Sequence, residues 1–588
     1  MIESRKLKKE DYYFIIVIII FIILLNFLFR IQVIEGKNYQ EIAEENYFRK
    51  IKKCSRRGII YDRNLQPLLE NVPSLAVYID IEKINDKEKL ADFLAENLSI
   101  TKEKVLNIIY QHRFRKFAPI LIDEGVDLET AIMFEENMDI FPSIIVKSES
   151  RRYYLYNDHF LGYVGKISQE EYKHLKTDEY NKTDYIGKVG LEKYYENDLK
   201  GEKGFDIVQV DASGSSLGLM RGDLSKPSIS GKDLVLTIDV DLQRELASLL
   251  PRDLSSAAVV MDCRTGGIIA SSSTPSYNQN MFVSGMNNEY WETIVNNKNN
   301  PLLNKVCNAT YPPGSIFKLL VAAYALEKKL VEPYEILVDC EGGVEYGGRF
   351  FGCWKKDGHG PVNLLDAIRV SCDTYFYKLA EMINLSDFKN FVDDCRITCK
   401  SEIDIMSERK GFFPTSLWYD ENYSKFGWTR GHILNLVIGQ GEVLVTALSM
   451  VRFYSSIANG GILVQPHFLD YYLYKGEKEK IEYNKIKLPI KQETLEFLKL
   501  SLDEAVNAKG RTGGMARVKG VRIGGKTGSA ENYKGDTHAW FAAIAPLQNP
   551  EISVVVFIEN GGSGAGAAAS LAGKIMAHYF DSEPILKY

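Results

Sequence analysis

The sequence predicts an α+β protein with an antiparallel sheet, in which a membrane-spanning helix and a strand-rich region precede the main domain. Three features carry this prediction. A long apolar segment lies near the N-terminus, short strand-like pieces in polar sequence follow it, and from about residue 255 helical segments lead to two apolar strands near the end. Strands and helices that are segregated along a chain are typical of α+β folds. The 588 residues suffice for several domains.

The apolar segment extends from Tyr12 to Phe29 and holds one polar residue, Asn26. As a helix it would span about 27 Å, close to the thickness of the hydrocarbon core of a membrane. No small-x-small cleavage motif follows it, which favours an uncleaved anchor over a signal peptide. A buried core helix is the remaining alternative.

Basic residues favour the cytoplasmic side of a membrane, and four of them precede the segment: Arg5, Lys6, Lys8 and Lys9. We therefore expect a protein that crosses the membrane once. Residues 1–11 would lie in the cytoplasm, 12–30 would form the anchor, and the rest would lie outside the cytoplasm. The formal net charge is −6, which argues against nucleic-acid binding. Eight cysteines in so long a chain do not indicate a disulfide-stabilised scaffold.

Two domains are expected outside the membrane, over residues 31–232 and 233–588. The boundary lies where a linker leads into a strand and a helix, in SKPSISGKDLVLTIDVDLQRELASLL. The second domain should begin with an apolar hairpin that turns at Arg264 to Gly267. It should end with the strands HAWFAAIAP and ISVVVFIEN, followed by a last helix over 567–580.

Two motifs of other enzyme classes occur in settings that do not suit them. Gly214 to Gly218 matches the G-x-S-x-G nucleophile elbow at Ser216, but no helix is expected after it. Gly520 to Thr527 matches the phosphate-binding P-loop, but no apolar strand precedes it and no helix is expected to follow. A P-loop NTPase is therefore a distant alternative.

Ser315 and Lys318 stand three residues apart, directly after Pro312-Pro313-Gly314 and at the start of an apolar helical run. The prolines suit the start of a helix, and Gly314 allows close backbone approach. Free N–H groups at a helix N-terminus stabilise negative charge, which suits an alkoxide and a neighbouring oxyanion. Lys318 shares the face of Ser315 and can accept its proton. The pair alone is also typical of an N-cap serine beside a surface lysine.

Two further motifs support the catalytic interpretation of this pair. Ser371-Cys372-Asp373 lies in a helical stretch, and Lys526-Thr527-Gly528 comes shortly before the closing strands. Their order, spacing and setting agree with the S-x-x-K, S-D-N and K-T-G motifs of penicillin-binding proteins and class A β-lactamases.

The chain resembles the class B penicillin-binding proteins, which are peptidoglycan D,D-transpeptidases, and in particular their elongation-specific type, penicillin-binding protein 2. RRGIIYDRN, LGYVGKI and GKVGLEKYYENDLKGEKG are similar to the family's pedestal, or dimerisation, domain, and YPPGS, CWKKDGHG and SCDTYFY to the elongation type. RRYYLYN, residues 151–157, departs from the family's RxYPxG. The resemblance implies a pedestal domain followed by a transpeptidase domain of the fold shared with serine β-lactamases.

The resemblance implies a catalytic role for four residues. Ser315 would attack the D-Ala–D-Ala carbonyl of a stem peptide, Lys318 would take its proton, and Ser371 would relay a proton to the leaving D-Ala. Asp373 stands where most relatives carry asparagine. A carboxylate near Lys318 favours the charged lysine unless Lys526 competes for it, and the sequence leaves this open.

Substrate binding is implied for the third motif. Lys526 and Thr527 would hold the terminal carboxylate of the substrate. Gly528 would let the substrate backbone lie against the strand edge, and the backbone N–H groups of Ser315 and Ser529 would form the oxyanion hole.

A β-lactamase and a membrane-anchored β-lactam sensor would use the same serine. A class A β-lactamase needs a glutamate-bound water, and no E-x-x-L-N stretch follows Asp373. The pedestal and the anchor favour a cell-wall synthase that β-lactams inhibit. The resemblance further implies stem peptides as substrates, and a RodA-like glycosyltransferase and other elongation-complex proteins as partners at the membrane.

A candidate zinc site lies between the first two motifs and comprises Cys340, Cys353, His359 and Cys372. Three cysteines and one histidine are a common closed, structural zinc set. Some relatives of the elongation type hold zinc here with aspartates among the ligands, so Asp339 is an alternative to Cys340. A Cys340–Cys353 disulfide or an unrelated Cys372 would also fit. The stretch GGRFFGCWKKDGHG is expected to be a loop ordered by the metal, and the chemistry itself requires no cofactor.

Overall fold

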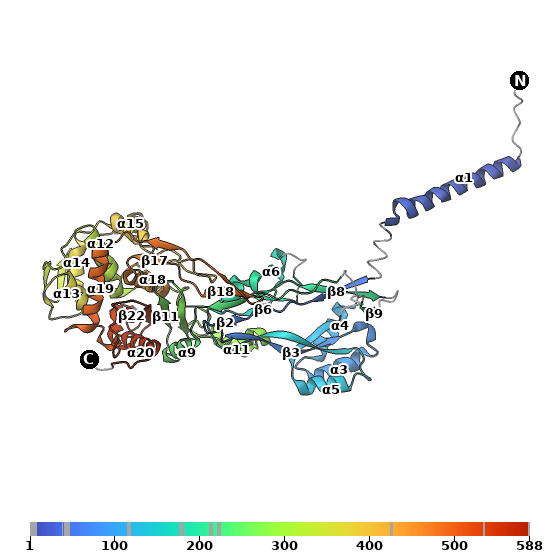
Figure 1. Cartoon of the computed structure of the whole chain (residues 1–588), viewed down its shortest axis with the longest axis horizontal. Coiled ribbons are helices and arrows are strands. Elements are labelled where there is room, and N and C mark those ends of the chain that lie inside the picture. Colours follow the sequence, from blue (N-terminus) through green and yellow to red (C-terminus); the bar gives the residue numbers. More distant parts are fainter. Residues whose placement is uncertain are drawn as a thin grey trace, which may run out of the picture. The chain divides into compact units, whose positions relative to one another are not determined.

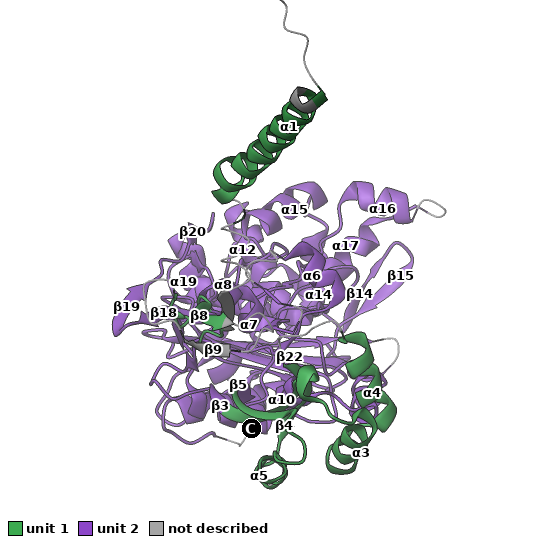
Figure 2. Cartoon of the chain, turned by 90° about the vertical axis from the view of Figure 1, so that its right-hand side faces the viewer, with its two compact units in different colours: residues 1–56, 73–149, 201–231 green, residues 57–72, 150–200, 232–588 purple. Residues whose placement is uncertain are grey.

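The computed structural model describes residues 9–37, 39, 48–113, 119–175, 180–181, 183–210, 216–219, 225–423, 427–532 and 535–585. The chain divides into two compact units (Figure 2). The first comprises Met1–Arg56, Pro73–Glu149 and Gly201–Gly231, and the second comprises Arg57–Val72, Ser150–Lys200 and Lys232–Tyr588. Within residues 31–232, which the sequence predicts to be one domain, the chain therefore passes between the units several times.

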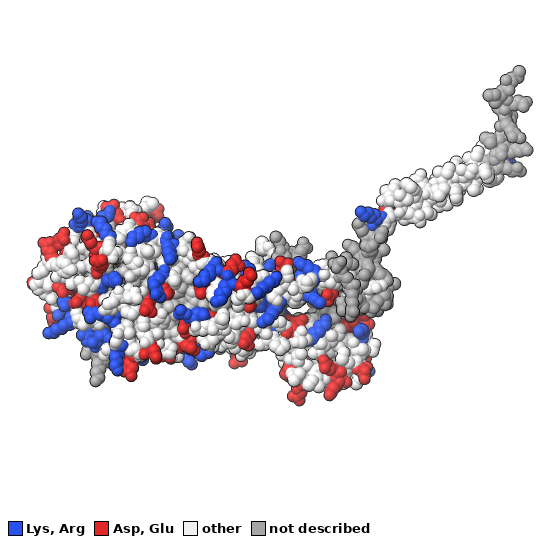
Figure 3. Space-filling view, viewed as in Figure 1, with Lys and Arg blue, Asp and Glu red and all other residues white. Residues whose placement is uncertain are grey.

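The N-terminal apolar segment forms helix α1, Lys9–Phe29, which continues as a π-helix over Arg30–Ile34 (Figure 1). The span Tyr12–Ile34 is long and apolar enough to cross a membrane, with a mean hydropathy of 3.0. Its side chains are exposed on all sides, and Figure 3 shows α1 almost free of charged residues. No second helix of this kind occurs in the described part of the chain. A helix that is apolar all round is typical of a membrane span.

Besides α1, the described part of the first unit contains two three-stranded sheets and three α-helices. One sheet has the order β1-β8-β9, with β1 Phe48–Lys53, β8 Gly204–Val210 and β9 Ser216–Leu219. The other has the order β4-β3-β5, with β3 Leu69–Ile79, β4 Ile120–Val126 and β5 Ile144–Tyr154. The helices are α3 Lys87–Asn97, α4 Lys102–Gln111 and α5 Leu128–Glu136. Each of them begins after a side chain that accepts a backbone N–H of its first turn, namely Asp86, Thr101 and Asp127.

The second unit is built on a five-stranded antiparallel sheet in the order β12-β11-β23-β22-β21. The strands are β11 Ser256–Asp262, β12 Ile268–Thr274, β21 Gly524–Ala530, β22 His538–Ala545 and β23 Ile552–Ile558. The predicted hairpin and both closing strands are confirmed, and β11 pairs with β23 along its whole length. Strand β21 ends the sheet order, so one of its edges has no partner strand in this sheet.

Both faces of this sheet are buried, because helices cover each of them. On β22, Ala539 and Phe541 face one core, whereas Trp540 and Ala542 face the other. The three central strands, β11, β23 and β22, are therefore mainly apolar and lack polar alternation, whereas the outer strands β12 and β21 also carry polar residues. One layer contains α9 Val240–Leu249 and α20 Ala569–Tyr579, and the other contains α12 Lys318–Glu327, α14 Asp373–Ala380, α18 Ala447–Ala458 and α19 Gln492–Asn507. The predicted last helix corresponds to α20, which follows a π-helix over Gly564–Ala568.

Smaller elements surround this core. A four-stranded sheet has the order β19-β18-β10-β2, with β2 Ile60–Tyr61, β10 Asp233–Leu236, β18 Leu469–Tyr474 and β19 Glu477–Lys480. Four strand pairs are β6 Val164–Lys166 with β7 Tyr185–Gly187, β13 Val338–Cys340 with β16 Gly360–Val362, β14 Gly343–Tyr346 with β15 Arg349–Gly352, and β17 Ile462–Val464 with β20 Lys485–Lys487. The other helices are α6 Gln169–His174, α7 Gly190–Tyr194, α8 Glu196–Leu199, α10 Gln279–Ser284, α11 Asn288–Val295, α13 Leu364–Arg369, α15 Leu385–Asp394, α16 Ser416–Asn422 and α17 Arg430–Val437.

A buried ion-pair network joins separate segments of the second unit. The buried Glu192 carboxylate accepts hydrogen bonds from Arg57 Nε at 2.8 Å and from Arg152 Nε at 2.7 Å. Arg57 also binds Glu196 at 2.7 Å, and Arg152 donates to the carbonyl of Gly58 at 2.7 Å. Burial raises the pKa of Glu192, but the charges of Arg152 and Arg57 outweigh it and hold the pKa below its usual value. The network therefore contributes stability only while all its charges are paired.

Replacing Glu192 by alanine should lower the free energy of unfolding by about 3–5 kcal/mol, because it leaves the buried Arg152 guanidinium without a carboxylate and removes one of the two carboxylates that bind Arg57. Thermal or urea unfolding of the purified protein measures the change. The matched control is Glu479→Ala, which removes an exposed ion pair with Lys232 and should leave stability almost unchanged. Equal effects of the two substitutions would contradict a structural role for the network.

Candidate active site

The predicted nucleophile, Ser315, lies in a 3₁₀ turn, Gly314–Phe317, that leads directly into α12 at Lys318. Gly314 has a φ of 56°, and a Cβ atom there would lie 2.7 Å from the carbonyl oxygen of Ser529. Only glycine allows this conformation and this approach. The serine thus stands at a helix start, as predicted, and its turn lies against strand β21.

Contacts on two sides fix the turn that carries Ser315. Trp540 Nε1 on β22 donates to the carbonyl of Pro312 at 2.9 Å. The N–H of Gly314 donates to the carbonyl of Gly439, also at 2.9 Å. The turn is therefore held both by the sheet and by the loop that follows α17.

Lys318 is fully buried and binds the second motif. Its Nζ donates to Asp373 Oδ1 at 2.7 Å, to the Ser371 carbonyl at 3.1 Å and to Ser371 Oγ at 3.4 Å. An ammonium group has three N–H donors, and three acceptors surround this one. The sequence left open whether Asp373 pairs with Lys318 or with Lys526. In this structure it pairs with Lys318.

Ser371 has a φ of 56°, which is rare for residues other than glycine. Such strain persists where the surroundings impose it, often at functional sites. Here the conformation lets both the carbonyl and the hydroxyl oxygen of Ser371 accept hydrogen bonds from Lys318.

Lys526 lies on β21, fully buried, and its Nζ donates to the Thr527 carbonyl at 3.0 Å. Burial lowers its pKa well below the usual value, and the charge of Lys318 adds to this effect, whereas Asp373 opposes it. Thr527 is mostly buried and Ser529 is exposed. The two lysines therefore differ, since Lys318 has a carboxylate partner and Lys526 does not.

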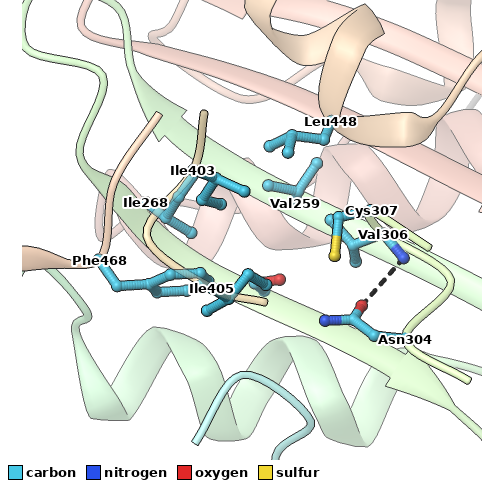
Figure 4. Close-up of a pocket in the computed structure, with 10 residues that line it drawn as sticks. Val259, Ile268, Asn304, Val306, Cys307, Ile403, Ile405, Leu448 and Phe468 are labelled. Carbon is cyan, nitrogen blue, oxygen red and sulfur yellow. Dashed lines mark hydrogen bonds between the residues drawn. The ribbon is translucent and has the colours of Figure 1, made fainter. Parts of the chain in front are cut away.

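The competing motifs do not form the structures that their chemistry requires. Ser216 begins strand β9 in the first unit, and no helix follows it directly. Lys526 and Thr527 belong to a strand, whereas in a P-loop they would begin a helix. A separate pocket is lined mainly by apolar side chains, including Val259, Leu448 and Phe468, and none of the motif residues contributes to it (Figure 4).

The four candidate zinc ligands, Cys340, Cys353, His359 and Cys372, come together, with one ligand atom of each within 4.8 Å of the others. His359 Nδ1 lies 3.6 Å from Cys340 Sγ and 3.5 Å from Cys353 Sγ. Hydrogen bonding with Cys372 and His359 lowers the pKa of the Cys353 thiol despite its burial. All eight cysteines are free thiols, so Cys340 and Cys353 form no disulfide in this structure. Asp339 is not part of the cluster.

The stretch around Cys353 was predicted to be a loop, and this is wrong for its first part. Arg349–Gly352 forms β15, which pairs with β14, because Phe350 and Phe351 alternate across a hairpin. The loop after it binds the second motif, since the Trp354 backbone N–H donates to Asp373 Oδ2 at 3.0 Å. Asp373 thus receives one hydrogen bond from Lys318 and one from the loop that holds the cluster.

Two residues near the motifs escaped the sequence analysis, Trp354 and Gln440. Gln440 Nε2 donates to the carbonyl of Ser529 at 3.3 Å. Both act through contacts between segments far apart in the chain, and no local spacing signals them.

Comparisons with known proteins agree with this geometry. Residues 256–577 match the penicillin binding protein transpeptidase domain, and residues 52–236 match the penicillin-binding protein dimerisation domain. The chain is 32% identical over 586 residues to the peptidoglycan D,D-transpeptidase MrdA of Haemophilus influenzae, covering 95% of this chain and 89% of that protein. For MrdA of Escherichia coli K12 the identity is 30% over 584 residues, with 94% and 91% covered.

Solved structures give the same result. The fold is similar to penicillin-binding protein 2 of Helicobacter pylori in a complex with MreC, with a TM-score of 0.81, 28% identity, and 91% of this chain and 99% of that one covered. For penicillin-binding protein 2 of Pseudomonas aeruginosa the TM-score is 0.70 and the identity 26%, with 92% and 98% covered. None of these relatives favours a β-lactamase, a sensor or a P-loop NTPase. The chain therefore belongs to the class B penicillin-binding proteins and is a peptidoglycan D,D-transpeptidase of the MrdA, or penicillin-binding protein 2, type.

Proposed function

We propose that this transpeptidase forms its acyl-enzyme on Ser315 and crosslinks stem peptides through that ester. One observation carries the assignment: Lys318, one turn from Ser315, is within hydrogen-bonding distance of Ser371 Oγ and Asp373. We infer a proton route from Ser315 through Lys318 to the hydroxyl of Ser371, of which the Lys318–Ser371 contact is formed in this structure. The position of Lys526 and Thr527 on the neighbouring strand β21 supports a carboxylate-binding role.

In the first half-reaction, Ser315 Oγ attacks the carbonyl of the D-Ala–D-Ala bond, the serine proton passes to the neutral amine form of Lys318, and Lys318 passes a proton on to Ser371. The oxyanion accepts hydrogen bonds from the backbone N–H groups of Ser315 and Ser529. The C–N bond breaks as Ser371 passes a proton to the leaving D-Ala. Asp373 positions Lys318 by accepting a hydrogen bond from its Nζ at 2.7 Å.

Lys526 and Thr527 bind the terminal carboxylate of the donor peptide. A carboxylate that approaches Lys526 favours the charged form of this lysine, so substrate binding and protonation are coupled. In the second half-reaction the amine of an acceptor peptide attacks the ester, its proton returns through the same groups, and Ser315 is released.

The proposal extends to the rest of the chain. Residues 31–232 serve as the pedestal and 233–588 as the transpeptidase domain, with residues 12–30 as a single anchor in the inner membrane and the catalytic part in the periplasm. The apolar helix α1 supports the anchor. Because one of the similar structures is a complex with MreC, we propose elongation-complex proteins as partners, together with a RodA-like glycosyltransferase.

We further propose that the four residues of the Cys/His cluster hold one structural zinc ion. Ligand atoms about 2.0–2.3 Å from a tetrahedral zinc lie roughly 3.3–3.8 Å apart, and the two sulfur–nitrogen distances to His359 are 3.5 and 3.6 Å. Four protein ligands leave no open position, so the ion would order the loop between β15 and β16, which contains Trp354, and take no part in the chemistry.

Benzylpenicillin should form a stable adduct on Ser315, detectable by mass spectrometry of the digested protein. Ser315→Ala should abolish labelling and crosslinking and leave the fold intact, because it removes only the nucleophilic oxygen. Ser216→Ala is the matched control and should label normally. An adduct mapped to any other residue, or labelling that survives Ser315→Ala, refutes the assignment.

Lys526→Met should slow penicillin labelling strongly but raise the free energy of unfolding at pH 7 by about 1–3 kcal/mol, the usual cost of a poorly paired buried polar group. A lysine whose pKa is lowered in the folded state binds its proton more tightly when unfolded, so wild-type stability rises with pH up to about 10.4. The difference in free energy of unfolding between Lys526→Met and the wild type should therefore become smaller between pH 7 and pH 10. Lys519→Met, at an exposed site, is the control. An advantage that is constant with pH contradicts the lowered pKa.

Elemental analysis should find about one zinc per chain, and Cys372→Ala or His359→Ala should lower the metal content and the melting temperature together. Cys395→Ala removes an equally buried thiol outside the cluster and should retain the metal. Zinc-free protein with Cys340 bonded to Cys353 would refute the site.

A further inference from the structure

The side chain of Gln440 occupies the free edge of strand β21 beside the motif residues. Its Nε2 donates to the Ser529 carbonyl at 3.3 Å, and its Oε1 accepts the N–H of Glu531 at 3.2 Å. A residue of a parallel strand added to this edge would make the same two bonds, to the carbonyl of one residue and the N–H of the second residue after it. The carboxamide therefore stands in for one peptide unit.

The edge that Gln440 covers is the one on which a peptide donor would pair. The other edge of β21 pairs with β22, with Ser529 opposite Ala539. Within a strand, the N–H and the C=O of one residue point to the same side. The Ser529 N–H, which we propose as an oxyanion donor, thus lies on the same side as the carbonyl that Gln440 binds.

Strand geometry makes Gln440 and a donor peptide compete for the Ser529 carbonyl. In a hydrogen-bonded antiparallel pair, two opposite residues exchange both of their backbone hydrogen bonds. A donor residue whose reacting carbonyl accepts the N–H of Ser529 therefore directs its own N–H at the Ser529 carbonyl. That is the oxygen to which Gln440 Nε2 donates.

The backbone at Gln440 is fixed, so only its side chain can yield. Its N–H donates to the Asn435 carbonyl at 2.9 Å, and the neighbouring Gly439 carbonyl accepts the N–H of Gly314 at 2.9 Å. A Cβ on Gly439 would lie 2.1 Å from the carbonyl oxygen of Gly314, so the loop and the nucleophile turn touch backbone to backbone. In contrast, the two side-chain bonds of Gln440 are long and solvent-accessible, which makes them weak.

We propose that Gln440 is a displaceable substitute for the donor backbone and a specificity-determining residue of acylation. It occupies the Ser529 carbonyl in the empty site and leaves when a donor with an N–H next to its reacting carbonyl binds. A donor without that N–H brings no hydrogen bond to the Ser529 carbonyl and leaves Gln440 in place. The inference rests on the proposed roles of Ser315 and Ser529.

The test compares two β-lactams on the full-length protein in detergent. Benzylpenicillin carries an amide N–H on the carbon next to its lactam carbonyl, whereas a carbapenem carries a hydroxyethyl group and no N–H there. Mass spectrometry gives the second-order rate constant of Ser315 acylation for each compound, and their ratio is the readout. Effects on folding or on the nucleophile change both rates and cancel in the ratio.

Gln440→Ala should raise the ratio of penicillin to carbapenem acylation about three- to tenfold, the range expected for one competing hydrogen bond. Gln440→Glu keeps the acceptor for Glu531 but cannot donate to Ser529, so it should raise the ratio similarly. Gln465→Ala is the matched control, because Gln465 bridges the Glu402 carbonyl and the Asn484 N–H in the same way on another surface, and it should leave the ratio unchanged.

Three results would overturn the proposal: an unchanged ratio in Gln440→Ala, a parallel fall of both rates, or a rise in Gln440→Ala that Gln440→Glu does not share. The melting temperature of each variant checks the fold, and the Glu variant serves if the Ala variant does not fold. If wild-type protein is not acylated on Ser315 at all, the proposed function fails, whereas a normally acylated wild type with an unchanged ratio refutes only the role of Gln440.

Discussion

Direct contact of backbone with backbone around Gly314 is the constraint on which the site depends. The nucleophile turn, the loop after α17 and strand β21 meet there without intervening side chains, since a Cβ on Gly314 or Gly439 would overlap a neighbouring main chain. This approach places the turn that carries Ser315 beside the backbone of Ser529. Larger residues would separate Ser315 from strand β21, on which we propose that the substrate binds.

Close to this contact, two buried lysines differ in the partners that stabilise their charge. Lys318 has Asp373 and both oxygens of Ser371, whereas Lys526 has one carbonyl and a pKa lowered by burial. Binding a negatively charged substrate next to the under-solvated lysine removes an electrostatic cost that the empty protein carries. Under the proposed function, the burial of Lys526 thus both lowers the stability of the empty site and favours the binding of a carboxylate.

Much of this was predictable from the sequence, because the signals were local. Ser315 and Lys318 fall three residues apart at a helix start, and β22 and β23 are apolar because both faces of the sheet are covered. The pairing of β11 with β23 joins residues about 300 positions apart, which no local pattern encodes. The choice of Asp373 between two lysines and the position of Gln440 depend on distances between segments far apart in the chain. Such distances follow only from the packed structure.

The chain passes between the two units several times, and this affects both folding during synthesis and the choice of truncated fragments. Arg57 binds Glu192, 135 residues later in the chain, and β2 pairs with β10. The first segment of the second unit can therefore form these contacts only after the later segments have been synthesised. A fragment that begins at residue 233 would lack Arg57, Arg152 and Glu192 altogether. The smallest piece of this chain that can retain the complete second unit therefore carries segments of the first unit with it, and excising those segments would require new connections in the polypeptide.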